Sequence, residues 1–170
     1  MKGAMIGLRL RKFYELKMFT VALLEPQIPP NTGNIARTCA ANNLDLVVVG
    51  QLGFELSDKY LKRAGLDYWE FSRIRYEPDL EKYLANLNMS HVYLLTTKGT
   101  KLYTAIKPQR GDTFVFGNEI WGFSKGLLKQ HSESCYTIPM INKNIRCLNL
   151  ATSVGIVMYH MLALYNFGLR

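Results

Sequence analysis

The sequence predicts an α/β fold built on an open sheet of parallel strands. The first observation behind this prediction is that short apolar runs of strand length alternate with stretches at helical spacing along the chain. The second is the stretch 19–50, in which an apolar run, a loop, a helical stretch and another apolar run form a βαβ unit. Such units have a right-handed crossover, which makes the two strands parallel. At 170 residues, the chain has the size of one domain.

The first strand is expected at residues 19–25 (FTVALLE), whose apolar character suits a central strand covered on both faces. Three prolines and a glycine in the following PQIPPNTGN then interrupt regular structure. Asn31, Thr32 and Asn34 are all good N-caps. We therefore expect a helix over about residues 32–43.

The remaining elements continue the same alternation. Strands are expected at residues 45–50, 91–99, 112–119 and 135–140. Helices are expected at residues 57–65, 79–87, 124–131 and 148–167. The last of these is apolar on nearly every side, and a helix of that kind is buried all round. We expect one of its faces to pack on the sheet and another to pack on a partner subunit.

Charge is unevenly distributed along the chain. The formal net charge is +8, and residues 1–17 contribute five basic residues against one acidic residue, which is half of the excess. We therefore divide the chain into a basic extension, residues 1–17, and a single domain, residues 18–170. The sequence leaves open whether the extension is native. The remaining excess is modest, so charge alone does not decide whether the partner is a nucleic acid.

Several classes of protein are disfavoured by composition. No apolar run approaches the about 20 residues that span a bilayer. Cys39, Cys135 and Cys147 form no C-x-x-C pair, so we expect free thiols in a reducing cytoplasm. The three histidines lack metal-ligand spacing, and we expect no metal. Neither a G-x-G-x-x-G nor a P-loop motif is present, which argues against a classical dinucleotide fold or a P-loop nucleotidase.

Unusual chemistry is concentrated in two segments near the carboxyl end, residues 116–126 (FGNEIWGFSKG) and 138–160 (IPMINKNIRCLNLATSVGIVMYH). Each reads as the end of a buried strand, a polar or glycine-rich loop and the start of a helix. The carboxyl ends of neighbouring parallel strands are where open α/β sheets bind ligands. Because glycine allows close approach of the backbone, we expect a cleft that reads its ligand largely through backbone groups.

Four segments carry a resemblance to a known family. They are EPQIPPNTGNIARTC (25–39), LTTKGT (95–100), FGNEIWGF (116–123) and IPMINKNIRCLNLATSVGIVMY (138–159). In order and spacing they resemble the motifs of the SPOUT superfamily of RNA methyltransferases. With KRAGLDYWEF (62–71), they resemble more narrowly the TrmL (YibK) group of tRNA 2′-O-methyltransferases. The resemblance covers nearly the whole chain, from about residue 18 to residue 167.

The resemblance implies a three-layer α/β fold whose carboxyl-terminal segment is tucked through a loop as a trefoil knot. It implies a homodimer, and S-adenosylmethionine as the methyl donor, which leaves as S-adenosylhomocysteine. The substrate would be the ribose 2′-OH of the wobble nucleotide of tRNA, a cytidine or modified uridine, in leucine isoacceptors. No metal is required for this transfer.

By matching positions, the resemblance also implies a set of residues that line the cofactor pocket. They are Leu95, Thr96, Gly117, Gly122, Ile138, Met140, Cys147 and Leu148. Plain core packing is the competing interpretation for the apolar members, and turn formation is the competing one for the glycines. Both interpretations of a glycine can hold together.

Four residues are candidates for catalysis. Asn34 and Arg37 are one helical turn apart on the same face. Arg37 would grip the target phosphate or polarise the 2′-OH, and we prefer this electrostatic role because a guanidinium stays protonated. A surface salt bridge is the alternative. Glu119 would hold the second substrate or cap a turn, and Asn149 would orient the nucleotide or cap the last helix.

Further basic residues are candidates for RNA binding, although each also reads as an ordinary solvated charge. They are Lys62, Arg63, Lys98, Lys101 and Arg146. Tyr159 matches a tyrosine at the family's dimer interface, with a buried core position as the alternative.

The chain departs from the family pattern at four positions. Cys147 and Ala151 stand where relatives usually carry serine, Phe123 replaces leucine and His160 replaces an acid. Two alternatives stay open. One is methylation of another tRNA or rRNA site, and the other, which the two lost hydroxyls favour, is an RNA-binding factor with little transferase activity.

Overall fold

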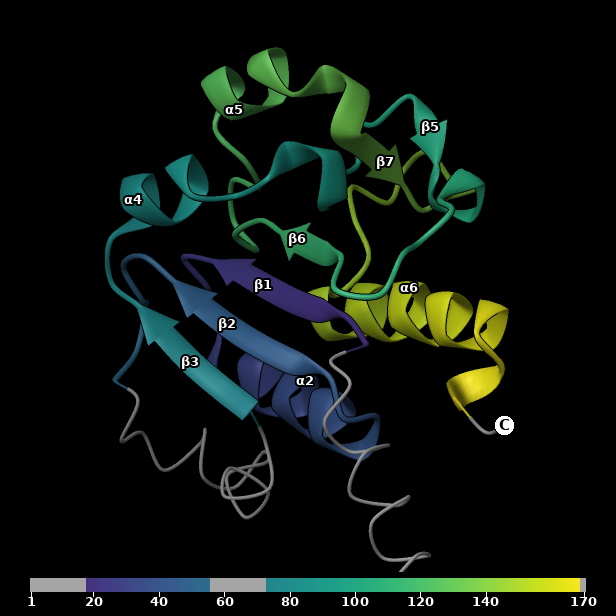
Figure 1. Cartoon of the computed structure of the whole chain (residues 1–170). Helices are drawn as coiled ribbons and strands as arrows, with labels where there is room; N and C mark the ends of the chain where they lie inside the picture. The colour runs from purple at the N-terminus through teal and green to yellow at the C-terminus, as the bar shows by residue number, and fades with distance from the viewer. Residues whose placement is uncertain (1–17, 56–72, 169–170) are drawn as a thin grey trace, which may run out of the picture.

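The computed structural model describes residues 18–55 and 73–168, and in them a single sheet of seven strands organises the chain (Figure 1). The strand order is β3-β2-β1-β6-β4-β7-β5. Every neighbouring pair is parallel, so the predicted α/β fold with parallel strands is confirmed. The strands are β1 (Thr20–Leu24), β2 (Asp45–Val49), β3 (Arg73–Glu77), β4 (Val92–Leu95), β5 (Lys101–Leu102), β6 (Thr113–Phe116) and β7 (Cys135–Thr137).

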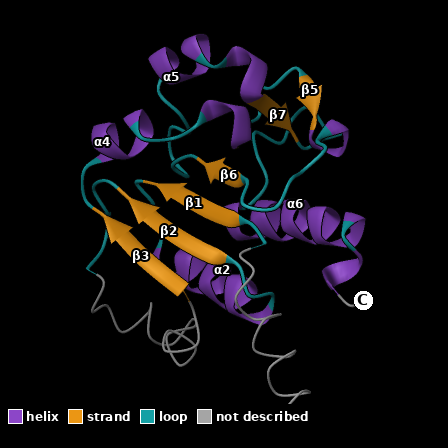
Figure 2. Ribbon diagram, in the orientation of Figure 1, coloured by secondary structure: helices purple, strands orange, loops and turns teal. Residues whose placement is uncertain are grey.

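Helices cover both faces of the sheet, which gives three layers (Figure 2). Side chains of α2 and α6 pack in the core cluster on one face, and side chains of α4 and α5 pack in the cluster on the other. The helices are α2 (Pro29–Ala41), α4 (Leu80–Ala85), α5 (Lys125–Gln130) and α6 (Leu150–Leu164). Short 3-10 turns complete the described elements: η2 (Met89–His91), η3 (Tyr103–Ala105), η4 (Ser132–Ser134) and η5 (Asn166–Gly168). In the described part of the chain, no helix is long and apolar enough to cross a bilayer.

The central strands are those with continuous apolar sequence. All five residues of β1 are buried, and so are the last four residues of β2, because helices cover both faces of these strands. The strands expected at 19–25, 45–50, 91–99, 112–119 and 135–140 are therefore present, each within the expected range.

Two strands were not predicted, and both lie at the sheet edges. β3 has the sequence RIRYE and is mostly exposed, and β5 contains only two residues. Edge strands of this kind lack the apolar run that marks a central strand, because one side of each has no neighbour to pack against. Their pairing partners, β2 and β7, determine where they form.

The predicted start of the first helix is wrong. α2 begins at Pro29, and its N-cap residue, Ile28, makes no side-chain capping hydrogen bond. Pro29 and Pro30 occupy the first two helical positions, where a missing N–H leaves no broken hydrogen bond. Asn31 and Thr32, expected as caps, lie buried inside the first turn.

The last helix is apolar on most sides but is not buried all round in the single chain. Val154, Val157 and Met158 are buried, whereas Tyr159 and Leu164 are half-exposed. α6 starts at Leu150, two residues later than expected, because Asn149 is its N-cap. The helix expected at 57–65 lies outside the described residues.

Candidate active site

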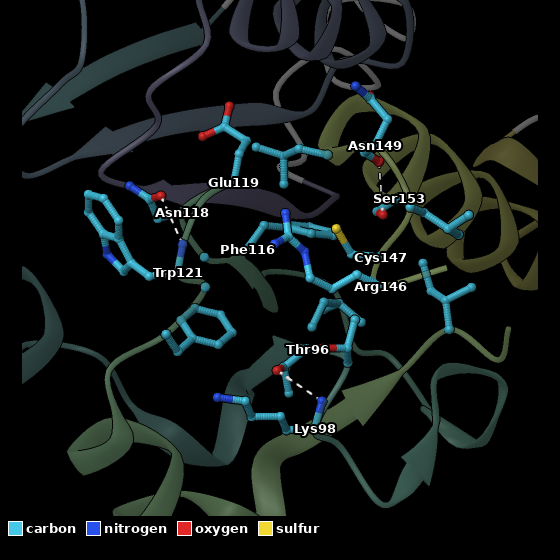
Figure 3. Close-up of a pocket in the computed structure, with 18 of the residues that line it drawn as sticks. Thr96, Lys98, Phe116, Asn118, Glu119, Trp121, Arg146, Cys147, Asn149 and Ser153 are labelled. Atoms are coloured by element: carbon cyan, nitrogen blue, oxygen red, sulfur yellow. Dashed lines mark hydrogen bonds between the residues drawn. The ribbon is translucent and has the colours of Figure 1, made fainter. Parts of the chain in front are cut away.

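A pocket of about 500 Å³ opens at the carboxyl ends of β4, β6 and β7 (Figure 3). Leu95, Phe116 and Thr137, the last residues of these three strands, form part of its wall. The other lining residues come from the loops that follow the strands, from the starts of α2 and α6, and from α5: Ile28, Asn31, Thr96, Thr97, Lys98, Gly117, Asn118, Glu119, Ile120, Trp121, Gly122, Phe123, Leu128, Ile138, Met140, Arg146, Cys147, Leu148, Asn149, Leu150 and Ser153.

The loop after β6 is a tight turn in which glycine is required twice. Asn118 and Gly122 form an isolated antiparallel bridge, with Gly122 N donating to Asn118 O at 2.9 Å. Gly122 has a φ of +71°, a region that L-residues rarely adopt. A Cβ on Gly117 would lie 2.7 Å from the carbonyl carbon of Gly122. The two backbone segments can therefore approach this closely only because Gly117 has no side chain.

A hydrogen-bond network joins this loop to both helix starts. The Glu119 carboxylate accepts from the backbone N–H of Gln27 (2.8 Å) and of Ile28 (3.3 Å), and from Asn31 Nδ2 (3.1 Å). Asn149 Nδ2 in turn donates to Asn31 Oδ1 at 2.9 Å. Because Glu119 lies beside the start of α2, its negative charge interacts favourably with the positive end of the helix dipole. Asn31 is thus the link between the loop after β6 and the start of α6.

Asn149 also caps α6 directly. Its Oδ1 accepts from the backbone N–H of Ala151 (2.9 Å) and of Thr152 (3.2 Å). The capping role considered for this residue is therefore present, and its amide nitrogen is used in the network with Asn31 at the same time. One side chain both begins the helix and holds the pocket wall together.

The loop after β4 is held against β7. Thr96 N donates to Tyr136 O at 2.8 Å, and Lys98 N donates to Thr96 Oγ1 at 3.2 Å. A Cβ on Gly99 would lie 2.6 Å from the carbonyl carbon of Tyr136, so this contact also requires glycine. The backbone of this loop is fixed, while the Lys98 side chain is exposed at the pocket.

The loop after β7 adds a thiol and a guanidinium. Arg146 and Cys147 are exposed and line the pocket, and Figure 3 shows them on the same side of it. The other two cysteines differ from Cys147 in their surroundings. Burial and the nearby Asp45 raise the pKa of the Cys39 thiol to about 12, and burial also raises the pKa of Cys135.

The structure brings most of the predicted site residues together. All eight predicted cofactor residues line the pocket: Leu95, Thr96, Gly117, Gly122, Ile138, Met140, Cys147 and Leu148. Glu119, Asn149, Arg146 and Lys98 line it too. This geometry shows where these side chains lie and leaves their roles as proposals.

Four of the predicted residues lie elsewhere, and none of them lines the pocket of the single chain. Asn34 and Arg37 are on the exposed face of α2, and Tyr159 is on α6. Lys101 is on β5, where its Nζ pairs with the Glu133 carboxylate at 2.6 Å. Lys62 and Arg63 lie outside the described residues.

Sequence reasoning missed Asn31, Asn118 and Trp121 as residues of the site. Asn31 was interpreted only as a helix cap, although it is buried and joins two elements far apart in sequence. The signal for Asn118 was its place between Gly117 and Glu119, where a short polar side chain can bond the backbone of its own turn.

Comparisons with known proteins found sequence relatives of this chain. The model of the SpoU rRNA methylase family matches residues 18–159. A tRNA (cytidine(34)-2′-O)-methyltransferase of Methylovorus glucosotrophus is 41% identical over 152 residues, which cover 89% of this chain and 98% of the relative.

Solved structures are similar as well. One described as giving structural insights into the 2-OH methylation of C/U34 on tRNA has a TM-score of 0.80 and 33% identity, and the match covers 88% of this chain and 97% of that one. The SpoU methyltransferase AviRb of Streptomyces viridochromogenes, in complex with AdoMet, has a TM-score of 0.75 at 18% identity, covering 89% and 59%. At that identity, the likeness concerns the fold alone.

Proposed function

Because this chain belongs to the SpoU rRNA methylase family, we propose that it transfers a methyl group from S-adenosylmethionine to the ribose 2′-OH of the wobble nucleotide of tRNA. The target would be a cytidine or a modified uridine, in leucine isoacceptors. One observation carries the proposal: the pocket at the carboxyl ends of β4, β6 and β7 contains every residue that the resemblance assigns to the cofactor. The names of the relative of Methylovorus glucosotrophus and of the 33% identical structure support the substrate.

The pocket fits a nucleoside of this kind in size and in lining. Its volume of about 500 Å³ lies within the range of small-molecule sites. Leu95, Ile138 and Leu148 would provide apolar contact, and the loops at Gly117 and Gly122 would bring backbone groups close. When bound, S-adenosylmethionine supplies an electrophilic methyl group on its sulfonium centre.

The residues around the pocket would act by positioning. Glu119 and Asn149 would hold the pocket loops in place through Asn31, because the carboxylate already accepts three hydrogen bonds. Lys98 and Arg146 would bind the RNA backbone as cations at the pocket. With the 2′ oxygen aligned to the methyl group, proximity and orientation would supply most of the rate enhancement in a direct in-line displacement.

Arg37 would enter the site from a second copy of the chain. It lies on the exposed face of α2, away from the pocket of its own chain, and α2 packs beside α6. Half-exposed Tyr159 and Leu164 on α6 would form part of the contact between copies. In the dimer, Arg37 of one copy would offset the negative charge that develops on the 2′ oxygen at the partner's pocket.

The proposal includes the arrangement of the chain. Residues 18–170 would form one methyltransferase domain, with residues 1–17 as a basic extension, and the family match over 18–159 supports the division. The segment between β7 and α6 would thread through a loop as a trefoil knot. The likeness to the 33% identical structure at a TM-score of 0.80 supports a shared fold, and the family resemblance implies the knot. We also propose that the protein acts in the cytoplasm, where tRNA is modified.

A nucleoside assay tests the function. Unmodified leucine tRNA is incubated with the protein and S-adenosylmethionine, then digested and analysed by mass spectrometry, with the wobble position identified from RNase fragments. We expect one 2′-O-methyl mark per tRNA at the wobble nucleotide. A tRNA whose wobble ribose is 2′-deoxy serves as the control, because it lacks the accepting oxygen. A mark that persists on this control, or no mark on the normal tRNA, contradicts the proposal.

A second candidate is methylation of another RNA site, which the description of the matching family as rRNA methylases favours. Ribosomal RNA and total tRNA would be treated in parallel, and a mark only on ribosomal RNA or at another tRNA position would support it. The remaining alternative, an RNA-binding factor with little activity, predicts binding of RNA without binding of S-adenosylmethionine in calorimetry.

A further inference from the structure

One large aromatic side chain at the pocket is left open to solvent. Trp121 is 57% exposed, whereas three apolar residues deeper in the same pocket, Leu95, Phe116 and Phe123, are each less than 10% exposed. The pocket therefore has a buried apolar wall and an exposed aromatic rim. A single exposed apolar side chain is ordinary on a protein surface. An exposed indole among the residues that line a pocket does, however, offer a flat aromatic surface on which a ligand can stack.

The backbone under Trp121 is held firmly. Asn118 Oδ1 accepts from Ile120 N at 2.7 Å and from Trp121 N at 3.4 Å, while Asn118 Nδ2 donates to Glu25 O at 2.6 Å. The bridge between Asn118 and Gly122 closes the turn on its other side. The turn thus presents the indole from a fixed support, which lowers the entropy lost when a ligand packs on it.

Charges around the pocket favour an anionic partner. Lys98 and Arg146 are exposed, and both line the pocket together with Trp121 (Figure 3). The lining carboxylate, Glu119, already accepts hydrogen bonds from two backbone N–H groups and one amide. A flat aromatic surface beside cations is the combination that binds single-stranded RNA, because bases stack on the ring and phosphates pair with the cations.

We propose that Trp121 stacks on the base of the nucleotide that is methylated and so positions its ribose at the pocket. This inference rests on the proposed function of the same site and adds the contact that holds the target base. Stacking accepts any base with a π-face. A tryptophan platform is therefore compatible with both a cytidine and a modified uridine at the wobble position.

An anticodon stem–loop RNA tests the contact, in two forms: one with the normal wobble base and one with an abasic wobble nucleotide. Their affinities for the wild type, Trp121→Ala and Trp121→Phe are measured by fluorescence anisotropy. We expect Trp121→Ala to weaken binding of the normal RNA by about 5- to 150-fold, the range for one stacked base. Trp121→Phe is expected to recover most of this loss. With the abasic RNA, wild type and Trp121→Ala should bind equally weakly.

Matched measurements separate stacking from other roles. Tyr76→Ala removes an aromatic side chain that is 42% exposed on β3, away from the pocket, and should change RNA affinity less than twofold. The dissociation constant for S-adenosylmethionine and the melting temperature should be unchanged in Trp121→Ala and Trp121→Phe. A loss of cofactor binding equal to the loss of RNA binding, or a change in oligomeric state, would assign Trp121 to the cofactor or to a subunit contact and overturn the inference.

The assay also distinguishes this inference from the function on which it rests. If the wild type methylates tRNA but Trp121→Ala binds both RNAs as the wild type does, stacking on the target base is wrong and the function stands. If the wild type neither binds S-adenosylmethionine nor methylates tRNA, the function itself fails.

Discussion

The two ends of the sheet use acidic side chains in different ways. At the amino ends of the strands, Asp112 is fully buried and accepts from Gln109 N at 2.6 Å, with His91 Nδ1 2.8 Å away. At the carboxyl ends, Glu119 also accepts backbone N–H groups, but it is only partly buried and lines the pocket. Both carboxylates organise a loop. The comparison suggests that Asp112 serves stability, while Glu119 serves the geometry of a site.

Among these variants, removing Arg37 should have the largest effect on activity. We expect Arg37→Ala to lower kcat for methyl transfer by about 10²- to 10³-fold, the loss typical of one group that stabilises charge in the transition state. The melting temperature should change little, because the side chain is exposed. Single-turnover transfer to tRNA measures the effect. Arg110→Ala, an exposed arginine at the amino end, is the matched control and should retain activity within twofold.

Replacing Asp112 should lower stability and leave activity nearly unchanged, which is the reverse of the result expected for Arg37. Asp112→Ala leaves Gln109 N without its acceptor inside the protein, and we expect it to lower the free energy of unfolding by about 2–3 kcal/mol. Activity per folded molecule should remain within twofold at 20 °C, a temperature chosen to keep the variant folded. Urea unfolding and transfer assays measure the two quantities. Loss of activity in fully folded protein would break the distinction between the two ends of the sheet.

Glu119→Gln tests the other half of the comparison. One oxygen that accepts from Gln27 N, or from Ile28 N and Asn31, becomes a donor facing donors. We expect about a tenfold loss of kcat/KM for transfer, equivalent to one hydrogen bond to a charged group, with a loss of stability below about 1 kcal/mol. If stability falls as far as in Asp112→Ala while kcat/KM is unchanged, Glu119 is a structural residue.

Selective alkylation of Cys147 should have the smallest effect of these changes, and it should act on cofactor binding. At pH 8, iodoacetamide should modify Cys147 first, because Cys147 is exposed and burial raises the pKa of both Cys39 and Cys135. A carbamidomethyl group on Cys147 would occupy part of the pocket and weaken S-adenosylmethionine binding by several-fold, up to about tenfold. Peptide mass spectrometry and calorimetry check the two steps. Cys147→Ser should bind the cofactor normally and be insensitive to the reagent.

Much of the fold could be predicted from local sequence. The hydrophobic pattern predicts the five apolar strands and α4, and Asp79 is a recognisable N-cap for α4. β3 and β5 could not be predicted in this way, because these edge strands form by pairing with β2 and β7 and not from an apolar pattern of their own. The start of α2 was misjudged because Asn31 and Thr32 are good caps in isolation, whereas two prolines and the carboxylate of Glu119 act there together.

For the site, the motifs identified residues that line the pocket. The hydrogen bonds that join these residues could not be predicted, because the partners are far apart in the sequence. Glu119 and Asn31 are 88 residues apart, and Asn31 and Asn149 are 118 residues apart. No local pattern relates residues at such separations. Arg37, by contrast, was predicted at the site by its motif and lies outside the pocket of the single chain. Its proposed role depends on a second copy.

The sequence by itself determined the α/β class, the central strands and the identity of the loop residues, since hydrophobic period and glycine placement are local properties of a chain. Only the tertiary structure decided that three loop segments meet around one pocket, that Asn31 joins Glu119 to Asn149, and that Trp121 remains exposed at the rim. The physical reason is that a side chain is buried, or finds a hydrogen-bond partner, only where two segments of the chain come into contact. A pattern in one segment records what that segment prefers, and packing determines which other segment satisfies it.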